Sequence, residues 1–341
     1  MLLSDFDYDY PEDLVALYPP EKRDASRLMV LDRKTKTWEH KKFKDILSYF
    51  QSGDVLVFNN SKVFPCRLLT QKKTGGKLEV FLVRELSQNI WECLLGDSKK
   101  INAGEKFDFG ENLRGEILDE YGETRKIRLD YTGNLFDILD SVGHIPLPPY
   151  IRRNDDSKLD RERYQTVFAN PIGSVAAPTA GFHFTPEIMT VFKNAGVHIC
   201  FVTLHVGLGT FLPIRTEKIL EHKMHGEYYE ISEETARVIN QAKKDKRLVT
   251  VVGTTALRAL ESSICSDGTV KTGRDFTEKF ITPPYEFKVA DRLLTNFHQP
   301  RSTLLVLISA FTDRQFILDA YREAVRQKYR LFSYGDCMLI E

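Results

Sequence analysis

The chain has 341 residues, and its 48 Lys and Arg residues are balanced by 48 Asp and Glu residues. This zero net charge argues against a general nucleic-acid-binding protein, which usually carries a basic excess, but it leaves room for a local basic patch. Hydrophobic residues make up 42% and charged residues 28%, which is typical of a soluble globular protein, and the length favours two domains.

The amino terminus, the apolar runs and the cysteines together indicate a cytoplasmic protein. The first ten residues, MLLSDFDYDY, carry acids where a signal peptide would carry a basic region and an apolar core. Every apolar run falls short of the roughly 20 residues that span a bilayer, so we expect no membrane segment. The five cysteines are scattered without a CxxC pair, which favours reduced thiols and argues against a zinc knuckle.

Residues 1–62 predict the opening of an α/β domain. Their dense Leu and Val content predicts strands at residues 28–33 and 54–58, and a proline at the start of residues 11–18 favours a helical turn there. The charged segment 21–27 is either a solvated connection or a loop that binds phosphate or substrate.

Residues 63–145 predict an all-β domain. The turn pair Gly75 and Gly76 separates two strand-like runs, residues 67–72 and 77–84, and therefore predicts a hairpin. Further short strands follow at spacings typical of a small antiparallel barrel or sandwich. The segment up to residue 163 is then predicted to be a linker, whose mixed charges are either solvated or contact a polyanion.

Strands and helices alternate after residue 173. We predict strands at residues 197–206, 248–253 and 304–311, and helices after Thr185, after Ser232 and over residues 313–328. Alternation of this kind implies an α/β fold with a mainly parallel sheet and flanking helices. Residues 1–62 and 146–341 then form one discontinuous α/β domain, and residues 63–145 form an inserted antiparallel β-barrel domain.

A threonine pair marks one strand end of the predicted sheet, where ligands of such folds bind. Gly253, Thr254 and Thr255 lie immediately before a predicted helix, so that free backbone N–H groups and two hydroxyls suit a carboxylate or a phosphate. The alternative is an ordinary threonine cap. No GxxxxGK or GxGxxG motif is present, which argues against a P-loop and a dinucleotide site.

Three histidines lie in dense motifs beside strand ends. His183 is in GFHFT, His205 in TLHVGLGTF and His298 in LLTNFHQPRST, and each is either a structural residue or a functional one. His222 and His225 are three residues apart and are spaced to meet a metal on one helical face, but no third ligand is specified.

The motif FSYGDCMLI near the carboxyl terminus places Tyr334 and Asp336 on either side of a glycine. Aspartate is a frequent turn residue, so this motif is either a turn before a last strand or the position of a carboxylate base.

Taken together, these motifs resemble one family. SVAAPTAGFHFT, TLHVGLGTF, GTTALRALES, LLTNFHQPRSTLL and FSYGDCMLI, with MLLSDFDYD and ERYQTVFA, are similar to the motifs of the S-adenosylmethionine:tRNA ribosyltransferase-isomerases, and the resemblance covers nearly the whole chain. It implies transfer and isomerisation of the ribosyl part of S-adenosylmethionine onto 7-aminomethyl-7-deazaguanine at the tRNA wobble position. The expected products are epoxyqueuosine-tRNA, adenine and methionine.

The resemblance also implies roles for single residues. The chemistry requires a base for the carbon beside the sulfonium and a group that manages the proton of the attacking amine, and neutral imidazole suits both near pH 7. We expect His183 or His205 to be a base, with Asp336 as a competitor. The expected substrate-binding residues are Thr179, Thr210, Gly253, Thr254, Thr255, Asn296, His298, Arg301 and Tyr334. The expected tRNA-binding residues are Lys72, Lys73, Lys77, Arg326 and Arg330.

The resemblance further implies a monomer without a cofactor, because S-adenosylmethionine is consumed as a substrate. Four positions depart from the usual family pattern, Asn60, Lys62, Pro284 and Gln299, and they put fine substrate preference in doubt. Two other functions stay open: a metal-dependent hydrolase that uses the histidines, and a tRNA-binding module that has lost catalysis.

Overall fold

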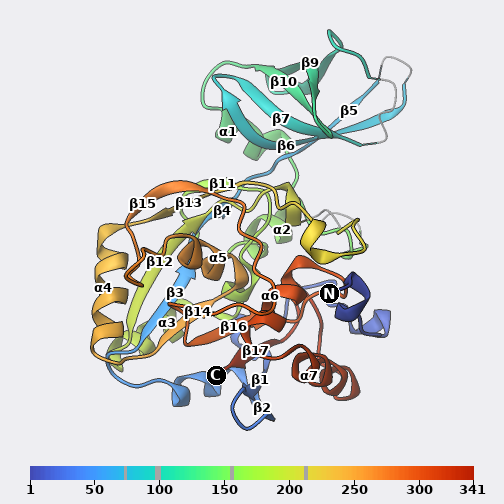
Figure 1. The fold of residues 1–341 in the computed structure, drawn as a ribbon. Coiled ribbons are helices and arrows are strands. Elements are labelled where there is room, and N and C mark those ends of the chain that lie inside the picture. Colours follow the sequence, from blue (N-terminus) through green and yellow to red (C-terminus); the bar gives the residue numbers. More distant parts are fainter. Residues whose placement is uncertain (73–74, 97–100, 154–156, 211–213) are drawn as a thin grey trace.

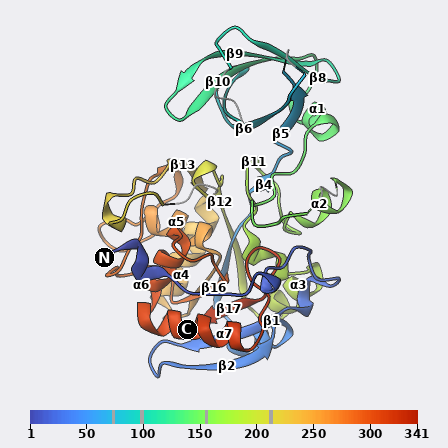
Figure 2. The same cartoon turned by 90° about the vertical axis from the view of Figure 1, so that its right-hand side faces the viewer.

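The computed structural model describes residues 1–72, 75–96, 101–153, 157–210 and 214–341. Figures 1 and 2 show a large α/β body, which holds both termini, and a β-barrel that projects from one side of it. In the described ranges, no helix combines the length and the apolar character needed to cross a membrane.

The α/β body is built on a nine-stranded sheet. In spatial order its strands are β15 (Gly273–Thr277), β13 (Glu227–Ile231), β12 (His198–Leu204), β3 (Val55–Asn59), β14 (Val249–Val252), β16 (Arg292–Asn296), β17 (Cys337–Ile340), β1 (Arg27–Asp32) and β2 (Thr37–Lys42). The four central strands, from β12 to β16, are mutually parallel.

The predicted α/β fold is confirmed, but a mainly parallel sheet is not, because the sheet is mixed. Antiparallel pairs join β15 to β13, β13 to β12, β16 to β17 and β1 to β2. An apolar run shows that a strand is buried but not which way it runs, so the outer strands could not be oriented from their residues.

Helices cover both faces of this sheet. Val55 and Val57 of β3 face a core that includes α4 (Glu233–Lys244), α5 (Thr254–Ser262), α6 (Thr303–Phe311) and α7 (Arg314–Arg326). Leu56 and Phe58, which alternate with them, face a second core with α3 (Pro186–Asn194). Burial on both faces explains why β3 has five consecutive buried residues. The predicted caps are confirmed, since Thr185 and Ser232 accept backbone N–H groups at the starts of α3 and α4.

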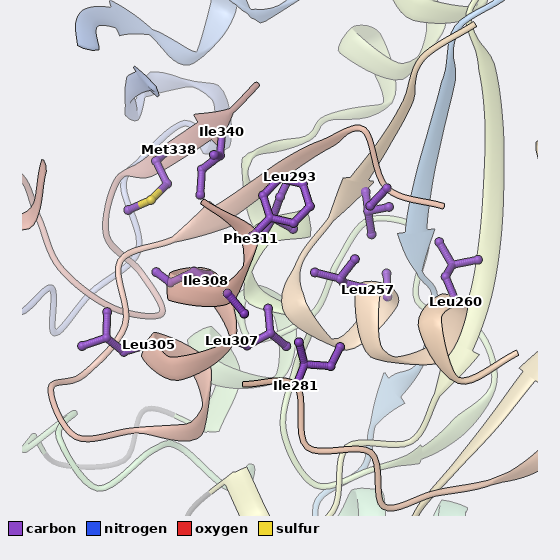
Figure 3. Close-up of a cluster of buried hydrophobic side chains, with 14 of the residues drawn as sticks. Leu257, Leu260, Ile281, Leu293, Leu305, Leu307, Ile308, Phe311, Met338 and Ile340 are labelled. Atoms are coloured by element: carbon purple, nitrogen blue, oxygen red, sulfur yellow. The ribbon is translucent and has the colours of Figure 1, made fainter. Parts of the chain in front are cut away.

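The strand predicted at residues 304–311 is instead the helix α6. Ser302 caps it by accepting the N–H of Leu305 at 3.2 Å. Leu305 to Phe311 are all buried, so the helix has no polar stripe that would reveal its period. Figure 3 shows its side chains packed towards Leu257 and Leu260 of α5, with Ile281 between the two helices.

The second body is a nearly closed antiparallel barrel, and the predicted hairpin is confirmed. Its six strands, in spatial order, are β5 (Arg67–Gln71), β6 (Lys77–Ser87), β7 (Ile90–Leu95), β10 (Thr124–Asp130), β9 (Leu113–Tyr121) and β8 (Lys106–Gly110). The two ends of the sheet meet where the Thr70 hydroxyl donates to the Asp108 carbonyl at 2.9 Å. The barrel has its own core, and α1 (Leu135–Val142) packs against it.

Short elements complete the fold. They are α2 (Ser157–Arg163), the parallel pair of β4 (Lys62–Val63) and β11 (Ile172–Ser174), and the 3-10 helices η1 (Leu3–Phe6), η2 (Glu12–Leu14), η3 (Arg23–Ala25), η4 (Phe43–Tyr49), η5 (Thr179–His183), η6 (Leu208–Thr210) and η7 (Ile219–Glu221).

The two connections between the bodies are hydrogen-bonded to each other. Arg67, on the way out, and His144, on the way back, exchange backbone N–H groups and carbonyls at 3.2 and 2.9 Å. A Cβ atom on Gly143 would lie 2.1 Å from the Pro65 carbonyl oxygen and 2.7 Å from the Leu139 carbonyl oxygen. Only glycine lets the two connections approach so closely.

We therefore expect Gly143→Ala to destabilise the protein. Both clashing atoms belong to the backbone, so the chain must shift, and overpacking of this kind costs about 1–3 kcal/mol. Urea unfolding should show the loss, while Gly76→Ala should be neutral, because a Cβ atom there meets only the Lys72 side chain, at 3.8 Å. Equal stability of the two variants would contradict the expected clash.

Candidate active site

The carboxyl ends of β12, β3, β14 and β16 meet at one edge of the sheet. The loop before β17 reaches the same edge, because β17 runs antiparallel to β16. In open α/β sheets this edge is the usual ligand site.

A buried amide joins three of these segments. At the end of β3, the Asn59 side chain accepts the N–H of Leu204 at 3.0 Å and donates to the carbonyl of Leu204 at 2.9 Å. It also donates to Thr255 Oγ1, at the start of α5, at 3.1 Å, and accepts the N–H of Ser61 at 3.1 Å. One side chain therefore fixes the ends of β3 and β12 relative to α5.

A cavity of about 350 Å3 lies at this edge, and we call it the edge cavity. Its lining comes from the loop around Pro149, η5, the starts of α5 and α6, the loop after β16 and the loop before β17. Arg301 is the one charged side chain among its described lining residues. The predicted substrate-binding residues that line it are Thr179, Gly253, Thr254, Thr255, Asn296, His298 and Arg301.

Two helices begin at the edge cavity. Gly253 caps α5 with φ of 88°, a left-handed conformation that suits glycine, and Ser302 caps α6. The first N–H groups of a helix have no partner within the helix and carry partial positive charge. Both starts therefore favour an anionic group in the cavity.

His298 is the histidine that lines the edge cavity. Its N–H donates to the Tyr321 hydroxyl at 2.8 Å, and its carbonyl accepts the Tyr8 hydroxyl at 2.6 Å. Its Nε2 lies 2.9 Å from Thr295 Oγ1. Burial lowers the pKa of His298 from 6.5 to about 3, so the ring is neutral at pH 7.

Arg301 has a partner in the amino-terminal segment. Its Nη2 lies 2.5 Å from Asp7 Oδ2, its backbone N–H donates to the Phe6 carbonyl at 2.8 Å, and its side chain is 59% exposed. The guanidinium is thus neutralised at the rim of the edge cavity.

A second cavity, of about 330 Å3, lies between the barrel and the α/β body, and we call it the interdomain cavity. The barrel side supplies Phe64, Trp91 and Phe136, and the α/β side supplies Tyr228 and the 58% exposed Phe276. The indole N–H of Trp91 is buried and finds no acceptor among the described residues. Val206 lines both cavities, so the two adjoin at the segment after β12.

His205 lines the interdomain cavity. Its ring stacks on Tyr228, with centroids 5.5 Å apart and planes at 18°, and a Cβ atom on Gly173 would lie 2.8 Å from the ring. Burial lowers the pKa of His205, with an opposing effect of Glu230, so the imidazole is neutral at pH 7.

A chain of hydroxyls holds the inner nitrogen of this ring. Nδ1 of His205 lies 2.8 Å from Ser61 Oγ, which contacts Ser174 Oγ, and Ser174 Oγ accepts the N–H of Val206 at 2.9 Å. When Ser174 donates to Ser61 and Ser61 donates to Nδ1, the ring proton is on Nε2. When these hydrogen bonds run in the opposite direction, Nδ1 bears the ring proton and Nε2 is free to accept a hydrogen bond. His205 is thus built to give or take a proton without moving.

His183 lies behind the edge cavity and outside its lining. Its ring is 2% exposed, with Nδ1 2.8 Å from Ser26 Oγ and Nε2 3.2 Å from Asn296 Oδ1. Asn296 in turn donates to the Phe332 carbonyl at 2.9 Å. Burial lowers the pKa of His183 from 6.5 to about 4, although Asn296 partly opposes this. Its contacts hold the loop before β17 in place.

Asp336 and Tyr334 lie apart from both cavities. The Asp336 carboxylate accepts the backbone N–H groups of Arg27 and Arg330, each at 2.9 Å, and also Nε of Arg27 at 3.3 Å. Tyr334 borders a space of about 10 Å3 with Arg23, and burial raises its pKa. The structure therefore separates these two residues from the candidate site at the sheet edge.

The predicted tRNA-binding residues fall into two distant sets. Lys72 and Lys77 lie at the barrel hairpin, and Lys73 lies outside the described residues, as does the side chain of Thr210. Arg326 pairs with Glu323 at 2.7 Å, and Arg330 donates to the Tyr18 carbonyl at 2.5 Å. Both views place the hairpin and α7 at opposite ends of the molecule (Figures 1 and 2). The two sets do not form one basic face.

The structure does not support a metal site at His222 and His225, on which the metal-dependent hydrolase alternative rests. The ring of His222 packs edge-on against Phe280 at 5.5 Å. Over the described ranges, the structure contains no group of three or more His, Cys, Asp and Glu residues arranged to hold a metal ion.

Sequence reasoning missed several residues of these cavities. Trp91 is one of only two tryptophans in the sequence, and this rarity could have marked it as a candidate functional residue. Ser61 and Ser174 gave none, because a serine next to a strand is most often a turn residue. Two of the four residues that depart from the family pattern can be compared with the edge cavity. Gln299 lines it. Asn60 lies outside its lining and accepts a hydrogen bond from the Thr203 hydroxyl at 2.8 Å.

Comparisons with protein families, curated proteins and solved structures all identify relatives of the same kind. Residues 3–340 match the family described as queuosine biosynthesis protein. The S-adenosylmethionine:tRNA ribosyltransferase-isomerase of Sulfurihydrogenibium sp. is 50% identical over 341 residues, and that of Syntrophotalea carbinolica is 51% identical over 344, each match covering 100% of both chains. The crystal structure of S-adenosylmethionine tRNA ribosyltransferase from Thermotoga maritima is 35% identical, has a TM-score of 0.56, and is matched over 99% of this chain and 100% of that one.

Burial of His183 should make stability depend on pH. Its folded pKa of about 4 lies below 6.5, so the unfolded chain binds a proton that the folded protein does not. Its contribution is complete above pH 6.5 and shrinks by about 3 kcal/mol as the pH falls to 4. Urea unfolding of His183→Gln should show a shallower decline, the remainder coming from residues such as His298. The exposed His198 is the control, and an unchanged decline in His183→Gln would refute the assignment.

Proposed function

The chain belongs to the queuosine biosynthesis protein family, and we propose from this premise and from its two cavities that it is an S-adenosylmethionine:tRNA ribosyltransferase-isomerase. It transfers the ribosyl part of S-adenosylmethionine to 7-aminomethyl-7-deazaguanine at the tRNA wobble position and isomerises it, which gives epoxyqueuosine-tRNA. Adenine and methionine are released. S-adenosylmethionine is a consumed substrate, and the reaction needs no cofactor.

The observation that carries this proposal is the pair of adjoining cavities. The reaction joins two substrates, a nucleoside with an amino-acid tail and a base displayed by a tRNA. The edge cavity and the interdomain cavity have similar volumes and share Val206. S-adenosylmethionine occupies the edge cavity and the deazaguanine occupies the interdomain cavity, so the ribose and the amine meet beside the segment 205–209.

The edge cavity suits S-adenosylmethionine because its lining is mainly apolar, carries several hydroxyls and has little charge. Hydroxyls of Thr179, Thr254 and Thr255 can bond the ribose and the purine, and the two helix starts favour the carboxylate. Pro149 supplies apolar surface for the adenine ring. The neutral ring of His298 adds no charge beside the sulfonium.

The interdomain cavity suits a base taken out of the tRNA stack. Aromatic side chains from both bodies offer faces on which a purine stacks, and the exposed Phe276 marks where the cavity reaches the surface. The carboxylate of Glu85 lies in its lining and suits the N–H donors and the ammonium group of the base, whereas Glu92 is already held by Arg84 and Thr124. The Trp91 N–H is available to a base oxygen.

His205 is the proposed proton-transfer residue for the amine. The aminomethyl group must lose a proton before it attacks the ribose. A neutral imidazole whose Nδ1–H donates to Ser61 can take this proton at Nε2 and becomes an imidazolium that Ser61 still holds. We assign no such role to His183, because both of its ring nitrogens already have partners.

Both cavities are complete within one chain, so we infer an enzyme that acts as a monomer in the cytoplasm, where its tRNA substrate is found. The barrel hairpin with Lys72 and Lys77 lies on the body that closes the interdomain cavity, and it is therefore a better candidate for tRNA contact than α7.

The test is incubation with S-adenosylmethionine and tRNA that carries the deazaguanine, followed by nucleoside mass analysis. Adenine, methionine and epoxyqueuosine should appear in equal amounts. Binding of tRNA without adenine release would favour the inactive binding module, and loss of activity with a chelator would favour the hydrolase.

We expect His205→Gln to lower the turnover number about 100-fold in an adenine-release assay, because general acid–base groups contribute about 100- to 10,000-fold. The amide can keep the bond to Ser61, so the fold should survive. His198→Gln, at the start of β12 and outside both cavities, is the matched control and should change turnover less than twofold. Near-normal turnover of His205→Gln would refute the role.

Trp91 should report directly on base binding. The chain has two tryptophans, and Trp38 lies on β2, stacked on Phe316 and distant from the interdomain cavity. In Trp38→Phe, the fluorescence of Trp91 should change when tRNA with the deazaguanine is added, because a base stacks within the cavity. Trp91→Phe, which keeps only Trp38, should show no change. The same response in both variants would place the base elsewhere.

A further inference from the structure

Arg258 is a buried charged residue that has no role in the site proposed above. It lies on α5, one turn after Thr254, and is 7% exposed. Its Nη1 donates to Glu227 Oε2 at 2.5 Å, and Glu227 is 4% exposed. Glu227 Oε1 also accepts the N–H of Gly207 at 2.9 Å, so the pair is attached to the segment that separates the two cavities.

The other edge of this guanidinium has no partner. Nε and Nη2 are buried, and neither finds an acceptor among the described residues. These two nitrogens lie on the same side of the planar group and present parallel N–H bonds, which is the fork that binds both oxygens of a carboxylate. A buried charged donor without an acceptor is costly, so this edge is prepared for an anion.

Arg258 borders a small lobe of the edge cavity. The lobe has a volume of about 30 Å3, which is enough for a group the size of a carboxylate. The lobe adjoins the edge cavity, because five residues line both: Gly209, Thr254, Thr255, Thr303 and Leu304. Ile281 and Leu307 close the lobe, and Figure 3 shows both between α5 and α6. Arg258 and Lys279 are the two cationic side chains of its lining.

The charges around the lobe favour one negative group. Arg258 and Glu227 cancel, and Lys279 leaves one positive charge in excess. Lys279 Nζ is engaged with the Glu261 carbonyl at 2.6 Å and the Tyr285 hydroxyl at 3.2 Å, so it acts through its charge. His222 and His225 also line the lobe, and burial lowers the pKa of His222, which is neutral at pH 7. The first turn of α5 adds partial positive charge.

We propose that Arg258 binds the carboxylate of the methionine part of S-adenosylmethionine in this lobe. The inference rests on the proposed function and specifies how the substrate is oriented. With its carboxylate in the lobe, the amino-acid tail passes between the starts of α5 and α6, and the sulfonium and the ribose lie in the edge cavity. Arg301 is a weaker candidate, because it is exposed and paired with Asp7.

The test compares S-adenosylmethionine with its decarboxylated analogue, which lacks only the carboxylate. Calorimetric binding to the wild-type protein without tRNA should be about 100-fold weaker for the analogue, the loss expected for a buried charged hydrogen bond. Arg258→Lys keeps the charge opposite Glu227 but loses the fork, and should bind both compounds equally. Arg237→Lys, on the exposed face of α4, is the matched control and should discriminate as the wild type does.

Each outcome separates this inference from the proposed function. Wild-type protein that binds no S-adenosylmethionine, either alone or with tRNA present, overturns the proposed function itself. Binding with discrimination retained in Arg258→Lys overturns only the carboxylate site. Weakened tRNA binding in Arg258→Lys, with unchanged S-adenosylmethionine binding, assigns the arginine to a phosphate and also overturns it. If Arg258→Lys fails to fold, Arg258→Met with Glu227→Gln removes both buried charges together and should bind the two compounds equally.

Discussion

The amide of Asn59 is the constraint on which the site depends. Its side chain is 1% exposed and bonds β12, α5 and the turn after β3, so it fixes where three strand-end segments stand relative to one another. Loss of such a bond within a buried network leaves unpaired partners, each costing about 1–3 kcal/mol. The rigidity of the sheet is transmitted in this way to the segment 205–209, which forms the wall between the two cavities.

Residue patterns predicted the parts of the fold that short-range physics determines. Thr185 and Ser232 correctly predicted the starts of two helices, because a cap acts within one helical turn. Gly75 and Gly76 correctly predicted the hairpin. The directions of the outer strands and the helix α6 were not predicted, because a uniformly apolar run carries no period and no direction. The site was predicted as motifs but not as a geometry. Nothing local distinguishes His298, in a cavity lining, from His183, enclosed by Ser26 and Asn296.

Neutral histidines are a common feature of the site, and their neutrality has a physical origin. Burial lowers the pKa of His183, His205 and His298, so none of them repels a cationic substrate at neutral pH. The charged residues near the edge cavity are paired: Arg301 with Asp7 at the rim, and Arg258 with Glu227 in the lobe. Both pairs lie away from the proposed position of the sulfonium. The two ends of the proposed binding site therefore differ in their charged groups, so the substrate can bind in only one orientation.

The paired connection at Arg67 and His144 has a mechanical consequence. It is a two-stranded ribbon that carries the whole barrel, and Phe64 and Phe136, which line the interdomain cavity, lie close to it in the chain. A small twist of such a ribbon swings the far end of the barrel through a much larger arc than its base. The close approach of the two connecting segments at Gly143 therefore sets the angle at which the barrel stands on the α/β body, and with it the width of the interdomain cavity.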